Sequence, residues 1–117
     1  METRYPEYYE HLRDMMGKLS KDLPGPMSGF GRLHRSAVAD GALSARVKEL
    51  IALGIAITVR CDGCLSYHVH DALKAGAKRE EILETIGVAV LMGGGPSAVY
   101  GAEALEALEQ FEAQELT

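Results

Sequence analysis

The sequence predicts an all-α fold, a compact bundle of about six helices, and two observations support this prediction. Apolar residues recur at helical spacing through nearly the whole chain, and no segment alternates apolar and polar residues as a half-buried strand does. The composition, 117 residues of which 47% are hydrophobic and 25% charged, is typical of a globular domain and too apolar for intrinsic disorder. We therefore expect residues 1–117 to fold as a single domain.

The first three helices have recognisable ends. Pro6 suits the first turn of the first helix, and the segment Leu23–Pro26 breaks it. A second helix is expected to stop at Asp40–Gly41, and Ser44 is a good N-cap for a third that runs to about Val59. In the first two helices the apolar residues that recur at helical intervals are Tyr8, Leu12, Met15, Leu19, Met27, Phe30, Leu33 and Ala37.

Glycines and acidic residues delimit the last three helices. The fourth is expected to begin around Cys61–Cys64 and to end before Gly76, which suits the left-handed position after a helix. Glu81 favours the first turn of the fifth helix, because a carboxylate there interacts well with the helix dipole. The glycine run 93–95 then separates a sixth helix that starts at Pro96. Its expected inward-facing residues are Val99, Leu105, Leu108 and Phe111.

Charge and hydropathy exclude several classes of function. A formal net charge of -5 without a basic cluster argues against a nucleic-acid partner. The longest apolar run, Leu50–Val59, is far shorter than the roughly 18–20 residues that a helix needs to cross a bilayer. The opening residues Met1–Pro6 lead into charged and aromatic sequence rather than the apolar core of a secretory signal. We therefore expect a cytoplasmic protein with no nucleic-acid or membrane partner.

Two helices are too apolar for an isolated chain. Leu50–Val59 is interrupted only by Gly54 and Thr58, and Ile86–Met92 is nearly as apolar. A helix that is apolar on all sides must be surrounded, whereas a domain of this size buries only about two-thirds of its unfolded surface. We expect a closed homo-oligomer with these segments or their neighbours at the subunit contacts. The alternative is that the two helices pack on each other beneath the other four.

The chain has two cysteines, Cys61 and Cys64, too few and too closely spaced for a disulfide-stapled secreted domain. A close pair in a reducing compartment indicates redox or metal chemistry. On a helix His68 lies one turn beyond Cys64 on the same face, where it can take the thiol proton, and the helix N-terminus favours a thiolate. We expect Cys64 to be the activated thiol and Cys61 the more exposed, resolving one.

Glu49 is the next candidate, because a carboxylate directly before an apolar helix stretch is costly without a partner. A short turn at Arg60 brings the next helix back alongside, and His68 lies in the middle of that helix. A carboxylate against this imidazole fixes its tautomer and raises its basicity. The alternative is a solvent-facing glutamate beside Arg46 and Lys48, and spacing alone leaves both open.

Other histidines and aromatic residues carry weaker signals. His70 lies about 120° around the helix from Cys64 and is expected at an interface or the surface, whereas Tyr67 is expected in the core. His11 and His34 have no close partners in the sequence and are expected in structural or surface positions.

Metal binding by the cysteine pair is an alternative to redox chemistry. A structural zinc site needs four ligands, and Cys61, Cys64 and His68 supply three, so only a catalytic zinc with three protein ligands stays open. The surrounding sequence lacks the βαβ pattern of a thioredoxin-like domain. Redox chemistry is therefore the favoured interpretation.

The stretch from about Leu23 to Phe111 resembles the carboxymuconolactone decarboxylase superfamily, in its alkyl hydroperoxidase AhpD-like branch. A glutamate twelve residues before a CxxC pair, with a histidine four residues after the second cysteine, is a specific signature of it. The segments that carry the resemblance are Gly41–Ser44, Lys48–Leu53, Cys61–Cys64 with His68, Ala72–Ala77 and Glu80–Ile82.

The resemblance implies an all-helical fold that assembles into trimers or hexamers. It also implies reduction of hydroperoxides by the CxxC pair, which a lipoyl group or another dithiol donor then reduces, with no metal or organic cofactor. Glu49 and His68 would form the proton relay, Cys64 the peroxidatic thiol and Cys61 the resolving thiol. Two departures stand out: AhpD proper has a histidine directly before its second cysteine, where this chain has Gly63, and it is a longer chain of two related halves.

The leading hypothesis is a cytoplasmic, dithiol-dependent hydroperoxide or disulfide reductase with an antioxidant role. One rival is a decarboxylase or lactone-processing enzyme that uses Glu49 and His68 as acid and base. The other is a metal-binding or redox-sensing oligomer without turnover of its own.

Overall fold

The computed structural model describes residues 3–115, which form six α-helices and, over that range, no β-strand. The helices are α1 Tyr5–Asp22, α2 Pro24–Val38, α3 Ala45–Val59, α4 Asp62–Lys74, α5 Arg79–Gly93 and α6 Gly95–Glu115. The predicted all-α fold of six helices is therefore confirmed. Met1 and Glu2, which contributed to the prediction about a secretory signal, lie outside the described residues. Over residues 3–115, no helix has the combination of length and apolar character needed to cross a membrane.

The predicted helix ends follow from local chemistry. The Ser44 hydroxyl accepts a hydrogen bond from the Val47 N–H at 3.2 Å, so it caps α3 as expected. Gly76 follows α4 with a φ of +96°, a left-handed conformation that suits glycine. The glycine run 93–95 was expected to separate the last two helices, but only Gly94, with a φ of +70°, lies between them. Gly93 ends α5 and Gly95 begins α6.

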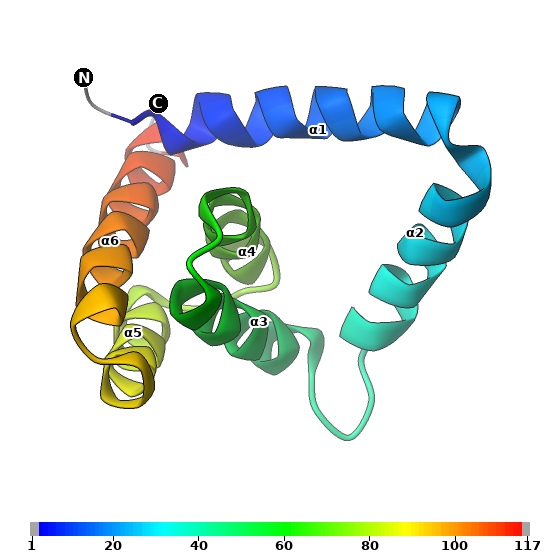
Figure 1. Cartoon of the computed structure of the whole chain (residues 1–117). Helices are drawn as coiled ribbons and strands as arrows, with labels where there is room; N and C mark the ends of the chain where they lie inside the picture. Colours follow the sequence, from blue (N-terminus) through cyan, green and yellow to red (C-terminus); the bar gives the residue numbers. More distant parts are fainter. Residues whose placement is uncertain (1–2, 116–117) are drawn as a thin grey trace.

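The core lies where α3 and α4 pack against each other and against α6, with α5 completing the bundle (Figure 1). The largest apolar side chains in it with no exposed surface are Leu53, Ile57, Leu65, Val69, Ile82 and Leu108. The start of α1 is fastened to this core, because the Tyr5 N–H donates to Gln110 Oε1 at 2.7 Å and its carbonyl accepts from the Ser66 hydroxyl at 3.0 Å. This clamp positions α1 across the end of α4.

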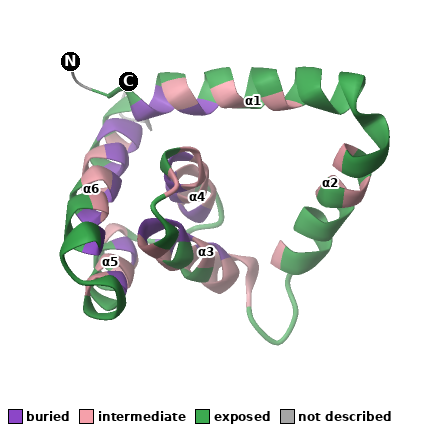
Figure 2. Cartoon of the chain, viewed as in Figure 1, coloured by how far each residue is buried: buried purple, intermediate pink, exposed green. Residues whose placement is uncertain are grey.

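Beyond that clamp the chain leaves the core. We call residues 10–38, the rest of α1 together with α2, the arm, and none of these residues is buried (Figure 2). The apolar stripe predicted for α1 and α2 is present, but much of it faces outward; Phe30 is 54% and Leu33 64% exposed. The expectation for α6 was likewise partly wrong, because Val99 is 61% exposed while Leu108 and Phe111 are buried.

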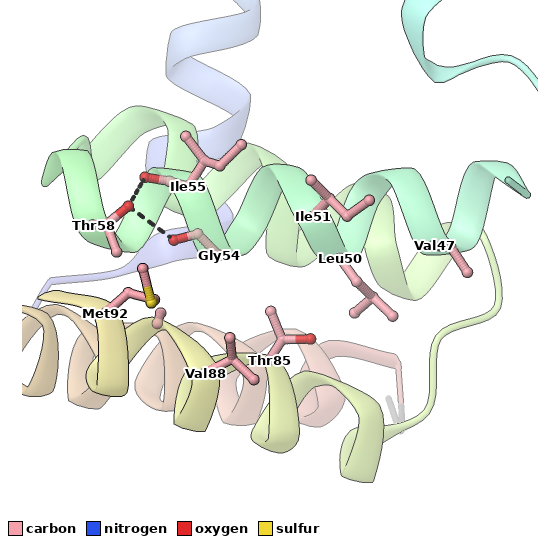
Figure 3. A pocket seen from close by; sticks show the side chains of 10 residues that line it. Val47, Leu50, Ile51, Gly54, Ile55, Thr58, Thr85, Val88 and Met92 are labelled. Carbon is pink, nitrogen blue, oxygen red and sulfur yellow. Dashed lines mark hydrogen bonds between the residues drawn. The ribbon is translucent and has the colours of Figure 1, made fainter.

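A second apolar surface lies on the far side of the core. Between α3 and α5 there is a groove of about 500 Å³, which we call the apolar groove (Figure 3). Its lining residues are Val47, Leu50, Ile51, Gly54, Ile55, Thr58, Thr85, Val88, Ala89 and Met92. The two most apolar helices therefore do pack on each other, yet each keeps an exposed outer face.

Candidate functional site

The cysteine pair lies at the sharp reversal between α3 and α4. Arg60 ends α3 in a left-handed conformation with a φ of 61°, and its N–H is directed at the carbonyls of Ala56 and Ile57. The next residue, Cys61, is already the N-cap of α4. The short turn expected at Arg60 is therefore present and returns α4 along α3.

Cys61 and Cys64 form a disulfide, with their Cα atoms 5.2 Å apart. Both residues are half-buried, and the Cys64 N–H donates to Cys61 Sγ at 3.1 Å. This hydrogen bond joins the Cys61 sulfur to the free N–H groups of a helix N-terminus, which stabilise a thiolate there. The helix end therefore supports the Cys61 sulfur, whereas His68 follows Cys64 by one turn along α4.

Glu49 and His68 are in direct contact, which is one of the two alternatives that spacing left open. His68 Nδ1 lies 2.7 Å from Glu49 Oε1, and Glu49 is only 5% exposed. The alternative of a solvent-facing glutamate is therefore wrong. Neither of the cations near Glu49 in the sequence pairs with it, because Arg46 binds Glu81 and the Lys48 ammonium donates to a backbone carbonyl.

The contact with Glu49 determines which imidazole nitrogen of His68 can act as a base. When Glu49 is ionised, it accepts a hydrogen bond from the imidazole Nδ1–H, which leaves Nε2 unprotonated. Nε2 can then act as a base toward a group on the same face of α4, where Cys64 lies one turn earlier.

Gly63 stands where AhpD proper has a histidine, and the structure shows which side chains surround it. A Cβ built on Gly63 would lie 2.8 Å from Leu12 Cδ2 and 3.6 Å from the Tyr8 hydroxyl. A larger residue at this position would therefore displace the Leu12 side chain. The N-terminal helix α1 covers this side of the cysteine turn, where AhpD proper carries an imidazole.

His70 was expected at an interface or the surface, and within one chain it is half-buried. Its ring stacks on Tyr9 with centroids 4.0 Å apart, and its Nδ1 lies 2.9 Å from Asp71 Oδ1. Tyr67 packs against the same Tyr9 ring, in agreement with its predicted packing role. Burial raises the pKa of both tyrosines, so their hydroxyls stay protonated near neutral pH.

His34 is the residue that the sequence analysis missed. It is exposed, as predicted, but from α2 it reaches the core, and one donor atom each of His34, Glu49 and Asp71 lies within 4.8 Å of the other two. No local pattern links it to Glu49, because the two lie on different helices. His11, by contrast, is simply exposed.

The fold and these segments have known counterparts. A model of the carboxymuconolactone decarboxylase family matches residues 24–107. A family member from Legionella pneumophila is 44% identical and superposes with a TM-score of 0.89 over 94% of this chain and 98% of that one. A Thermotoga maritima family member, for which a part in an antioxidative response has been suggested, is 28% identical with a TM-score of 0.83 over 93% of this chain and 92% of that one.

Similarity to a protein of Cupriavidus necator, described as uncharacterized, extends over 90% of this chain and 89% of that protein, with 38% identity over 105 residues. The family match takes in both cysteines, Glu49 and His68. Because it also spans most of the chain, the chain belongs to the carboxymuconolactone decarboxylase family.

Proposed function

We propose that this protein is a dithiol-dependent hydroperoxide reductase of the AhpD-like type. The observation that carries the proposal is the 2.7 Å contact between buried Glu49 and His68, one helical turn from a cysteine pair that can close into a disulfide. A carboxylate–imidazole pair at that position is the arrangement that a nucleophilic thiol requires. The antioxidative response suggested for the Thermotoga maritima relative supports the same assignment.

In the proposed cycle, His68 takes the Cys64 proton and Glu49 stabilises the imidazolium. The Cys64 thiolate attacks the terminal oxygen of the hydroperoxide, and the O–O bond breaks. This step gives a Cys64 sulfenic acid and an alkoxide, which takes the proton from His68 and leaves as an alcohol. The Cys61 thiol then gives up its proton and attacks the Cys64 sulfur as a thiolate; the S–O bond breaks, and the hydroxide takes up that proton and leaves as water.

The cycle closes when a lipoyl group or another external dithiol reduces the Cys61–Cys64 disulfide. The two electrons that reduce the peroxide therefore come from this donor, and the cycle needs no metal or organic cofactor. The cytoplasm, where thiols are kept reduced, is the compartment in which such a donor is available. Disulfide reduction in another substrate would use the same pair in the same way.

We also propose that the protein works as a closed homo-oligomer, a trimer or a hexamer. The chain exposes two separate apolar surfaces, the outward stripe of the arm and the apolar groove, and a single copy covers neither. Ile55 and Met92 in the groove are 56% and 76% exposed. A second copy of the chain offers an apolar partner to each surface, and closed symmetry limits the assembly to a defined size.

The test is a peroxide-consumption assay with hydrogen peroxide and an organic hydroperoxide, each with dihydrolipoamide or dithiothreitol as donor. We expect donor-dependent turnover in the wild type and none in C64S. In C61S treated with peroxide before any donor is added, a sulfenic acid should accumulate on Cys64, because the thiol that resolves it is missing. Equal peroxide reactivity of Cys61 in the C64S variant would reverse the assignment of the two thiols.

The decarboxylase or lactone-processing alternative makes the opposite prediction. Acid–base chemistry by Glu49 and His68 needs no thiol, so a lactone substrate would still be turned over by the C61S/C64S double variant. Absence of peroxide consumption together with such thiol-independent turnover would overturn the proposed function.

A further inference from the structure

Three helices bring together a second group of side chains, near the start of α3 and the end of α4 rather than at the cysteine turn. One donor atom each from His34 on α2, Glu49 on α3 and Asp71 on α4 lies within 4.8 Å of the other two. Ligand–metal distances of about 2.0–2.2 Å put two donors no more than about 4.4 Å apart around one ion. A small contraction would therefore bring all three donors into the range of a single metal ion.

The two carboxylates of this group are held in place by imidazoles. His68 Nδ1 contacts Glu49 at 2.7 Å, and His70 Nδ1 contacts Asp71 at 2.9 Å. The His70 ring is itself fixed by stacking on Tyr9. Ligating carboxylates in metal sites have such hydrogen-bonded outer partners, which orient them.

The charges of the group also favour a cation. Two carboxylates lie close together, and one of them, Glu49, is nearly fully buried. Among the described residues their ion-pair partners are histidines only, with no lysine or arginine. Buried carboxylates are paired or bind metals, and the histidine partners of these two carboxylates carry a positive charge only when they are protonated.

We propose that His34, Glu49 and Asp71 bind one divalent first-row transition-metal ion of the zinc class. Two carboxylates and one imidazole match the oxygen and nitrogen donors that zinc accepts, with water at the fourth position. The site is separate from the cysteines, and binding there does not depend on the proposed peroxidase function. Because α2 contributes no buried residue, the ion would also tie the arm to the core.

The test is isothermal titration of untagged, oxidised protein with Zn²⁺. In this form the Cys61–Cys64 disulfide removes both thiolates as ligands, so zinc bound by cysteine gives no signal. We expect one ion per chain in the wild type, an affinity at least about tenfold lower in H34Q and in D71N, and no change in H11Q. His11 lies on the arm but outside the group, so H11Q is the matched control.

A second measurement reports directly on helix α2. Hydrogen exchange of the α2 amides should slow when Zn²⁺ is added to the wild type but not to H34Q, because the ion is the added link between α2 and the core. Thermal unfolding of D71N and H34Q without zinc shows whether the variants are folded.

Three results would overturn the metal proposal: no binding by the oxidised wild type, an affinity in H34Q and D71N equal to that of the wild type, or binding that appears only after the disulfide is reduced. The titration contains no peroxide, and the peroxidase assay can be run with a chelator. Failure of one proposal is therefore distinguishable from failure of the other.

Discussion

Helices α4 and α2 are both amphipathic, but the apolar face of α4 is buried whereas that of α2 is largely exposed. The apolar face of α4 is surrounded by α1, α3 and α6, and Leu65, Val69 and Ala72 have no exposed surface. The apolar residues of α2 include Phe30 and Leu33, yet no residue of α2 is buried.

The difference shows which parts of the structure a single copy completes and which apolar surfaces it leaves exposed. One copy builds the cysteine turn and the Glu49–His68 contact, because both depend on α4 packing along α3. The same copy leaves the outward stripe of the arm and the apolar groove uncovered. The site is thus built within one copy, whereas we propose that other copies cover these two surfaces.

The largest expected effect concerns assembly. L33E on the arm and I55E in the apolar groove each place a carboxylate in a surface that we expect to be buried between copies, and both should dissociate the oligomer. S28E adds the same charge to α2 at an exposed polar position and should leave assembly unchanged. Light scattering coupled to size-exclusion chromatography measures the masses. A monodisperse wild-type species of 12.6 kDa would show that the uncovered surfaces are not subunit contacts.

A second prediction tests whether the chemistry is confined to α3 and α4. H68Q should slow alkylation of Cys64 near neutral pH by about a hundredfold or more, the range of a lost general base. E49Q should have a smaller effect, since it acts through His68, and the double variant should be no worse than H68Q. Iodoacetamide alkylation followed by mass spectrometry gives the rates, with H11Q as the control on the arm. Additive effects of E49Q and H68Q would place Glu49 outside the relay.

The stability of the two helices can be compared directly with L65A on α4 and L33A on α2. L65A removes a fully buried side chain and should cost about 2–5 kcal/mol of unfolding free energy. L33A should cost no more than about 0.5 kcal/mol in dilute, separated chains. Its cost should rise at concentrations where the chain assembles, which urea unfolding at two concentrations can measure. An equal loss for both variants in dilute protein would mean that α2 packs within its own chain.

The smallest expected effect concerns the clamp at which the arm begins. Burial and the nearby Glu103 carboxylate raise the pKa of Tyr5 above its ordinary value of 10.0. The folded state therefore holds this proton more tightly than the unfolded state. The resulting stabilisation is complete below about pH 10 and is lost as the pH rises toward the folded-state pKa. The stability advantage of the wild type over Y5F should shrink above about pH 10, and a constant difference would contradict this assignment.

The sequence alone predicted those features that depend on local chemistry. Ser44 as a cap, Gly76 after α4 and the return of the chain at Arg60 all follow from residues close together in the chain. Spacing left the Glu49–His68 contact open beside a solvent-facing Glu49, and the family resemblance favoured the contact that the structure has.

Features that depend on longer-range packing could not be predicted. His34 reaches Glu49 and Asp71 only because α1 and α2 turn back around the core, and no spacing in the sequence encodes that path. Val99 is a second example, because it was expected to face inward but is exposed. Helical periodicity identifies the apolar residues of α6 but not which of them a neighbouring helix covers.

The most direct test of the central claim is a single-turnover titration of the reduced protein under anaerobic conditions. One equivalent of an organic hydroperoxide per chain is added, and free thiols, residual peroxide and alcohol are measured, with C64S treated in parallel. The account predicts one Cys61–Cys64 disulfide and one alcohol per peroxide consumed in the wild type, and unreacted peroxide with C64S. Peroxide left unconsumed by the wild type, with both thiols still free, would contradict it.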